Sequence, residues 1–415
     1  MVASVQMRHS FAVLGSLLAL ICLGGCGNTP TDPDPAYSIE SRTPGIAEQR
    51  FGKWMEGSVR ARSAGVDGLY YAYYDTDTST PTHLSPMISA EVLRYRLGLG
   101  EIAAAREIGE ALLPWQAQIS ADTRRSRNAG AYPSEIAARE DGSFEARYLY
   151  DSYDSLAVAE ALLDLFDATS DVRYLKSAER VGSWIRDVMS QGDTFALWLS
   201  NLDAPMKAVT DAGDFDNRIA VGRTLFFLPT LHRLSERTGD ESYAALASRA
   251  ATWLLDAQTP SGAFYDHYDP GYPPVAFDPD RFAPFGSDGS VVADDSLRAG
   301  LAAWQLGYTD AADSLADWVP DASGGVPGYL SLANGGEHFP GANIPYHDVI
   351  SSSLHAALIE RNGGDASEAR EFVLGLQDAD GGWHWGWTVD APEVVGTLQS
   401  TLTGLWAFVD LLPQG

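Results

Sequence analysis

The feature that most constrains how this chain can fold is an internal repeat of two helical segments joined by a tight turn. The pattern Thr-x-Asp-x2-Tyr-x3-Ala-x5-Trp begins at Thr169 and again at Thr238, with the same spacing in both copies. The segment before Thr238 is apolar on nearly all sides, which indicates a buried helix. The segment after it has one apolar stripe, which indicates an outer helix. The repeat therefore predicts pairs of one inner and one outer helix.

Six such pairs account for the chain beyond about residue 45. The predicted outer helices cover 46–62, 101–113, 172–188, 241–256, 309–318 and 364–376. The predicted inner helices begin near His83, Asp151, Asp216, Asp294, His347 and Gln399. Six hairpins predict an all-α fold, the (α/α)6 barrel, in which a repeat buries a continuous core by closing on itself. Residues 45–415 are therefore expected to form a single barrel domain.

Three long loops rich in Gly, Pro and aromatic residues lead into inner-helix starts. They cover 118–147, 262–293 and 320–346. Because all inner helices of such a barrel begin at the same end, we expect these loops to gather on one rim and to enclose a pocket there.

The first 44 residues carry a different signal. Residues 1–25 read as a secretory signal peptide, because Arg8 and His9 precede a short apolar run. Leu23-Gly24-Gly25-Cys26 resembles a bacterial lipobox, which implies cleavage before Cys26 and attachment of lipid to its sulfur. The alternative is a plain membrane anchor, although the run is short for a span.

Residues 26–44 are rich in Pro and Asp, and we expect them to form a tether that builds no core. The protein is therefore predicted to be exported and lipid-anchored to a bacterial membrane, in the periplasm or at the outer membrane or cell surface. The lipid on Cys26 is the only membrane contact expected.

The net charge and the positions of the cysteines exclude one class of partner and two kinds of site. The formal net charge is −28, which argues against nucleic acid as a partner because phosphates would be repelled. Both cysteines, Cys22 and Cys26, lie in the leader region. The body of the chain therefore has no disulfide and no thiolate metal site.

Acidic residues cluster at the predicted inner-helix starts, with aromatic residues nearby. The polar residues are Asp151, Asp154, Asp211, Asp214, Asp216, Asp294, Asp295, His347 and Asp348. The aromatic residues are Tyr148, Tyr150, Tyr153, Tyr265, Phe285, Tyr346, Trp383, Trp385 and Trp387. Paired carboxylates supply acid and base for glycosidic bonds, and aromatic rings stack on sugars. An oligosaccharide substrate is therefore predicted.

Two other interpretations of these residues remain open. Each aspartate could simply cap a helix, since Asp is a favoured N-cap. His267 and His347 could be metal ligands, and Asp294-Asp295 could bind calcium. No second histidine lies four residues from either histidine, and the Gly-spaced calcium loop is missing. No metal or cofactor is predicted.

An ordered set of short segments resembles the six-hairpin glycosidase superfamily, and within it the unsaturated glucuronyl hydrolases and their rhamnogalacturonyl relatives. The resemblance covers roughly residues 150–360 and implies an (α/α)6 fold and oligosaccharide hydrolysis. The similar segments are Asp216-Asn217, Gly262-Ala263-Phe264-Tyr265-Asp266-His267-Tyr268-Asp269, Ala293-Asp294-Asp295-Ser296 before Trp304, Gly325-Val326-Pro327 and Ser351-Ser352-Ser353.

The resemblance also implies catalytic roles. Asp216 matches the acid/base aspartate, which protonates the double bond of a 4,5-unsaturated uronic acid and activates water. Asp154 matches the second essential aspartate, with Asp151 as the competing choice. The family's Arg-Gly-Gln is replaced here by Gly300-Leu301-Ala302, with the arginine at Arg298. The residues expected to bind substrate are Asp151, Asp294, Arg298, Tyr265, His267, His347, Trp383 and Trp385.

The leading hypothesis is therefore a glycoside hydrolase that uses Asp216 and Asp154 as general acid and base. A uronyl C5-epimerase or polysaccharide lyase on the same fold is the first alternative, with Tyr150, Tyr153 or His347 as the base. A glycan-binding surface lipoprotein without catalysis is the second.

Overall fold

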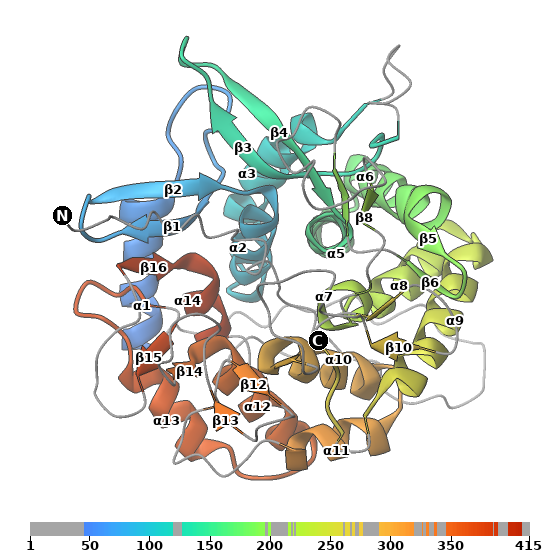
Figure 1. Ribbon diagram of the computed structural model, residues 1–415. Helices are drawn as coiled ribbons and strands as arrows, with labels where there is room; N and C mark the ends of the chain where they lie inside the picture. Colours follow the sequence, from blue (N-terminus) through green and yellow to red (C-terminus); the bar gives the residue numbers. More distant parts are fainter. Residues whose placement is uncertain are drawn as a thin grey trace, which may run out of the picture.

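The structure, a computed structural model, is shown in Figure 1. Residues 1–44, which are predicted to contain a signal peptide and a tether, lie outside the residues that it describes. The described residues are 45–118, 127–195, 198–200, 215–216, 219, 221–259, 262–265, 268–269, 274–276, 290–318, 326, 329–331, 336–337, 346–384, 386–388 and 397–408.

Six inner helical segments form a closed ring, which confirms the predicted barrel. They contact one another in chain order, and the last returns to the first. The inner segments are α2 (Pro86–Gly98), α5 (Ser152–Thr169), α7 (Val221–Leu225) with α8 (Leu228–Thr238), α10 (Ala293–Gln305), α12 (Val349–Arg361) and α14 (Thr401–Ala407). Each begins within a few residues of its predicted start.

The outer helices surround this ring (Figure 1). They are α1 (Ile46–Trp54), α3 (Ile102–Leu112), α6 (Val172–Trp184), α9 (Glu241–Ala257), α11 (Thr309–Trp318) and α13 (Ser367–Gly375). Helices α1 and α6 each continue into a π-helical turn, at Met55–Val59 and Ile185–Met189. All six outer helices lie within the predicted ranges or one residue beyond. No helix among the described residues is long and apolar enough to cross a bilayer.

The repeated turn between inner and outer helices has the geometry that its residues favour. Ser170 and Gly239 adopt positive φ angles of 57° and 76°, which end α5 and α8. Asp171 and Asp240 then cap α6 and α9 by accepting hydrogen bonds from the backbone N–H of Arg173 and Ser242. The two copies of the sequence pattern are therefore two copies of one structural turn.

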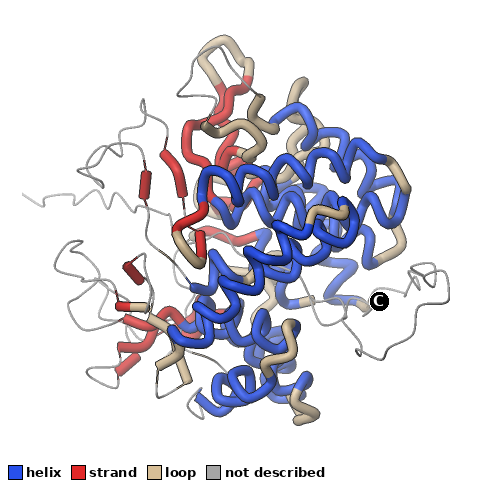
Figure 2. Tube along the Cα trace, turned by 90° about the vertical axis from the view of Figure 1, so that its right-hand side faces the viewer, coloured by secondary structure: helices blue, strands red, loops and turns tan. Residues whose placement is uncertain are grey.

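Short strands precede every inner helix, and the sequence did not predict them. They are β2 (Thr80–Leu84), β4 (Phe144–Asp151), β8 (Phe215–Asp216), β11 (Ser290–Val292), β14 (Tyr346–Asp348) and β16 (Leu398–Ser400). Four of these, β2, β4, β8 and β16, belong to one antiparallel sheet with the order β16-β1-β2-β3-β4-β7-β8. Its other strands are β1 (Tyr71–Asp75), β3 (Pro133–Ala138) and β7 (Trp198–Ser200). Figure 2 shows the strands gathered on one side of the helical body. The described strands that lead into the inner helices therefore lie at one rim of the barrel.

A glutamine that follows an outer helix joins neighbouring hairpins at three places, and we call each glutamine with the glycine segment that it binds a strap. In each strap the side-chain Nε2 of the glutamine donates one hydrogen bond to the carbonyl of that glycine and another to a carbonyl of the next outer helix. Gln116 binds Gly130 and Ser177, Gln258 binds Gly262 and Ala311, and Gln377 binds Gly381 and Ala47. The glycine lies four residues after the glutamine at Gln258 and Gln377, but 14 residues after it at Gln116.

Helix α7 lies against the start of α10 at a position that only glycine allows. A Cβ added to Gly222 would lie 2.1 Å from the carbonyl oxygen of Asp295. The Gly222→Ala variant is therefore expected to lose about 2 to 3 kcal/mol of unfolding free energy by overpacking. Urea denaturation measures this loss.

Gly52 in α1 is the matched control, because its added Cβ would meet nothing within 4 Å. Gly52→Ala is expected to be neutral or slightly stabilising, since alanine favours the helix. Equal stability of the two variants would contradict the close packing of α7 on α10.

Candidate active site

The start of α5 contributes two aspartates to the rim. Asp151 ends β4 and caps the helix, with its Oδ1 accepting a hydrogen bond of 2.7 Å from the backbone N–H of Tyr153. Asp154 lies in the first helical turn. Each of the two aspartates is 8% exposed. Strand β4 and the cap therefore fix both carboxyl groups at the mouth of the barrel.

The start of α12 contributes a third aspartate, Asp348. Asp348 ends β14 and caps α12 through its Oδ2, which accepts 2.8 Å and 2.6 Å hydrogen bonds from the backbone N–H and hydroxyl of Ser351. Its backbone N–H donates to the carbonyl of Val326, which joins the end of β14 to the chain that precedes it. Asp348 is also 8% exposed.

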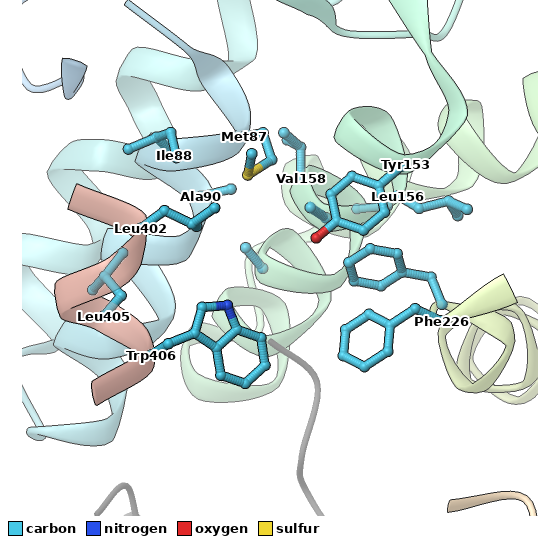
Figure 3. Close-up of a cluster of buried hydrophobic side chains, with 14 of the residues drawn as sticks. Met87, Ile88, Ala90, Tyr153, Leu156, Val158, Phe226, Leu402, Leu405 and Trp406 are labelled. Carbon is cyan, nitrogen blue, oxygen red and sulfur yellow. The ribbon is translucent and has the colours of Figure 1, made fainter. Parts of the chain in front are cut away.

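The start of α10 contributes a fourth carboxylate together with a buried cation. Asp294 Oδ2 lies 3.2 Å from a terminal guanidinium nitrogen of Arg298, a residue one turn farther along the helix. Arg298 is fully buried, and its guanidinium stacks over the ring of Trp406 in α14. Its other terminal nitrogen lies 3.5 Å from the hydroxyl of Tyr153. Figure 3 shows Tyr153 and Trp406 projecting from α5 and α14 into the same interior space.

These charged groups influence one another across the rim. Burial and the nearby charge of Asp294 raise the pKa of Asp348 to about 6, against the lowering effect of the Ser351 bonds. Burial raises the pKa of Tyr73 on β1, with a further contribution from the charge of Asp154. Burial also raises the pKa of Tyr153, despite the opposing charge of Arg298. Charged groups at the starts of α5, α10 and α12 are therefore close enough to change one another's pKa values.

The backbone of Asp216 lies in the same sheet as Asp151. Trp198 of β7 pairs with Asp151 of β4 on one side and with Asp216 of β8 on the other. Strands in a sheet are spaced about 4.8 Å apart, so the Cα atoms of the two aspartates are separated by roughly 10 Å. The sheet thus brings the chain at Asp216 next to the start of α5.

Two expected substrate-binding residues are instead interior. Trp383 is fully buried, packs edge-on against Phe51 and Phe408, and donates its indole N–H to the carbonyl of Val373. Its ring belongs to the core between α1 and α14. Arg298 lies beneath the rim and pairs with Asp294, so in this structure it positions a carboxylate and does not face solvent.

The other expected residues are placed only in part. Tyr265 is partly buried, and its ring lies 5.9 Å from that of Tyr268. His347 is described only as backbone in β14, where it pairs with Trp387. His267 and Trp385 lie outside the described residues. Within the described part of the chain, no three His, Cys, Asp or Glu residues are grouped to hold a metal ion.

Two buried groups of the site, Tyr73 and Glu91, were not predicted from the sequence. Tyr73 reaches the site because β1 pairs with β2 and β16, a long-range arrangement with no local signal. Glu91 of α2 is fully buried, and burial raises its pKa well above the usual range. Arg94 and Arg298 are among the charges acting on Glu91. A glutamate between the apolar residues Ala90 and Val92, in the middle of a predicted inner helix, was the signal that could have pointed to it.

Known protein-family models and the curated proteins gave no match to this chain. Solved structures gave many, at low sequence identity. A novel alpha-amylase from Clostridium perfringens is 12% identical over 89% of this chain and 98% of its own, with a TM-score of 0.63. Cellobiose 2-epimerase from Bacillus thermoamylovorans B4167 is 11% identical over 88% and 95%, with a TM-score of 0.61.

An unsaturated glucuronyl hydrolase specific for heparin is also similar in structure. It is 10% identical, and the match covers 88% of this chain and 95% of its own, with a TM-score of 0.58. Identities this low establish a shared architecture. The chain therefore has the (α/α)6 fold of the six-hairpin glycosidases.

Proposed function

We propose that the protein is a carbohydrate-active enzyme, a glycoside hydrolase that cleaves oligosaccharides by aspartate acid/base catalysis. The observation that carries the proposal is the gathering of buried carboxyl groups from α5, α10 and α12 at one rim of the barrel. Hydrolysis of a glycosidic bond needs one group to protonate the leaving oxygen and a second to activate water or attack the sugar. A rim with several carboxyls in different environments can supply both.

Asp216 and Asp154 are the proposed central pair. The sheet register supports this pairing, because it brings the backbone at Asp216 to the neighbourhood of Asp151 and the start of α5. Tyr73 and Tyr153 lie close enough to Asp154 for the charge of that carboxylate to raise the pKa of both hydroxyl groups. Unsaturated uronides are included among the proposed substrates because of the similarity to the glucuronyl hydrolases.

The structure weakens one route to the epimerase or lyase alternative. Those reactions require a base that removes a proton from carbon. Burial raises the pKa of Tyr153, so its hydroxyl stays protonated at neutral pH and is poorly suited to this task.

A screen of plant and algal oligosaccharides, with unsaturated uronides among them, tests the proposed function. A hydrolase releases new reducing ends and consumes the ultraviolet absorbance of unsaturated uronides. Appearance of that absorbance would indicate a lyase, and exchange of solvent deuterium into the sugar would indicate an epimerase. Glycan binding without turnover of any substrate would favour the non-catalytic alternative and overturn the proposal.

We also propose that the protein is exported and held at a bacterial membrane by lipid on Cys26. The Cys26→Ser variant is expected to move the protein from the membrane fraction to the soluble fraction, because one acyl chain or more provides the binding energy. Fractionation followed by immunoblotting measures this. Cys22→Ser is the matched control and should leave the protein in the membrane fraction. Retention of Cys26→Ser on membranes would contradict the lipid anchor.

A further inference from the structure

Asp294 and Asp348 both lie at the starts of neighbouring inner helices. Asp294 lies in the first turn of α10, and Asp348 is the N-cap of α12. The two helices pack directly against each other in the ring. Both side chains are largely withdrawn from water, with 14% of the Asp294 side chain and 8% of Asp348 exposed. The rim thus contains a pair of carboxyl groups at the starts of two adjacent inner helices.

The two carboxyl oxygens of Asp348 have different surroundings. Oδ2 accepts both the backbone N–H and the hydroxyl of Ser351, at 2.8 Å and 2.6 Å. Among the described residues, Oδ1 receives only a long contact of 3.4 Å from the backbone N–H of Ile350. Ser351 therefore fixes the orientation of the carboxyl group through Oδ2 and leaves Oδ1 available to carry a proton.

Other capping aspartates of this chain show what a cap alone does. Asp171 and Asp240 cap α6 and α9 by accepting backbone N–H groups in the same way. Hydrogen bonds to side chain and backbone lower the pKa of Asp171 to about 2, and they also lower that of Asp240. Asp348 has the same kind of cap but a pKa shifted in the opposite direction, through burial and Asp294. Capping alone therefore does not account for Asp348.

Arg298 fixes the position of Asp294 in this pair. Its salt bridge to Asp294 holds that carboxylate at the rim, and its own position is set by Trp406 and Tyr153. A carboxylate held close to a second, buried carboxyl disfavours ionisation of the second, because two like charges repel strongly where water is scarce. Arg298 thus acts through Asp294 on Asp348.

We propose that Asp348, and not Asp216 or Asp154, is the proton donor of the glycosidase reaction, and that Asp294 and Arg298 are its positioning residues. Asp216 and Asp154 then serve on the side of the reaction that activates water. The assignment rests on the proposed function. As the glycosidic C–O bond breaks, the proton on Oδ1 of Asp348 passes to the leaving oxygen. Water supplies a hydroxyl to the anomeric carbon, and the remaining proton of that water passes to a carboxylate across the rim, at Asp154 or Asp216. Asp348 then regains a proton from solvent.

Titration of the carboxyl groups tests the electrostatic half of this proposal without any substrate. In protein labelled with ¹³C at aspartate Cγ, one carboxyl should titrate with a midpoint near 6 and should be missing from Asp348→Asn. In Asp294→Asn the midpoint should move to lower pH, because removal of a negative charge favours ionisation of Asp348. Asp171→Asn is the control and should leave the midpoint unchanged. Absence of such a carboxyl, or an unchanged midpoint in Asp294→Asn, would overturn the pair.

Dependence on the leaving group tests the catalytic half. For a glycoside that the substrate screen identifies, Asp348→Asn should lower kcat about 100-fold or more on the oligosaccharide. On the matching 2,4-dinitrophenyl glycoside, whose leaving group needs no proton, the loss should be less than about 10-fold. Equal losses on both substrates in a folded variant would remove Asp348 from the role of proton donor.

The pH profile gives a second kinetic measurement. Only the protonated form of Asp348 can donate, so activity should fall as pH rises through about 6. In Asp294→Asn that fall should occur at lower pH. If Asp216→Asn abolishes turnover while Asp348→Asn leaves the rate and the profile unchanged, the proposed function stands and this inference fails. Failure of the wild-type protein to turn over any glycoside overturns both.

Discussion

Replacing Asp216 with asparagine is expected to lower kcat by about 1,000-fold or more on the substrate that the protein hydrolyses. Asparagine has nearly the same shape as aspartate but can neither donate nor accept the catalytic proton. General acid/base groups contribute factors of about 100 to 10,000 to enzymatic rates, and the same residue serves in more than one step. The melting temperature should stay within about 2 °C, because the change is isosteric and leaves the helices of the barrel untouched.

The control for this prediction is Asp67→Asn. Asp67 is an exposed aspartate in the loop before β1, remote in sequence from every inner-helix start. The Asp67→Asn substitution removes the same charge and should leave kcat within about twofold of the wild-type value. Steady-state kinetics and thermal unfolding of the two variants separate a catalytic role from a general effect of charge. Full activity of Asp216→Asn would remove Asp216 from the catalytic pair.

Replacing Arg94 with methionine is expected to destabilise the protein by about 3 to 5 kcal/mol, the largest stability effect that we predict. Arg94 of α2 is 5% exposed at its side chain and forms a 2.7 Å ion pair with Asp164 of α5. A second contact of 3.6 Å reaches Glu160 on the same helix. Loss of the guanidinium leaves these buried acids with less compensating charge. A buried ion that loses its partner is far more costly than an exposed one.

Arg94 belongs to a larger buried network that joins three inner helices. Arg233 of α8 reaches Glu160, Asp164 and Asp167 of α5 at 2.6 Å, 2.9 Å and 3.1 Å. In the Arg94→Met variant, the positive charge of Arg233 still offsets part of the negative charge of these buried acids. The variant is therefore expected to fold. Chemical denaturation with fluorescence detection of the tryptophans measures the loss.

The effect of Arg94→Met should depend on pH. Burial opposes ionisation of Asp164, but Arg94 and Arg233 together lower its pKa below the usual value. A carboxyl whose pKa is lowered by folding stabilises the protein above its unfolded-state pKa of about 3.9, and this contribution is lost as pH falls through the folded pKa. The loss of unfolding free energy in Arg94→Met should therefore be greatest near neutral pH and should become smaller in acid.

Arg249→Met is the matched control. Arg249 is 49% exposed at its side chain, and its contact to Asp193 is 3.9 Å long. Exposed pairs of this kind contribute little, so the change in unfolding free energy should be below about 0.5 kcal/mol. Comparable losses in Arg94→Met and Arg249→Met would contradict the importance of the buried network.

The helices and their order were largely predictable from the sequence, because helical periodicity and capping are local. The matched turns at Thr169 and Thr238 have the cap residues and the positive φ angles that their residue types favour. The straps at Gln258 and Gln377 were also recognisable, since glutamine and glycine there are four residues apart. The strap at Gln116 was not, because its glycine is Gly130.

The rim was predicted less completely. The seven-stranded sheet joins segments as distant in sequence as β1 and β16, and its strands are short. Pairing of short, distant strands leaves little local pattern. Trp383 was placed at the rim because it lies near other aromatic residues in sequence, yet packing against Phe51 and Phe408 holds it in the core. Sequence proximity to a site does not determine which way a ring points.

The amino-acid sequence by itself determined the number of hairpins, the division into inner and outer helices and the end of each inner helix that carries acids. These follow from periodicity and capping within a few turns of one helix. Only the tertiary structure decided which acids become neighbours. Asp294 and Asp348 acquire their mutual effect because ring closure brings α10 against α12 and removes water from both. Burial and charge proximity are properties of the assembled barrel, and they set the chemistry of its rim.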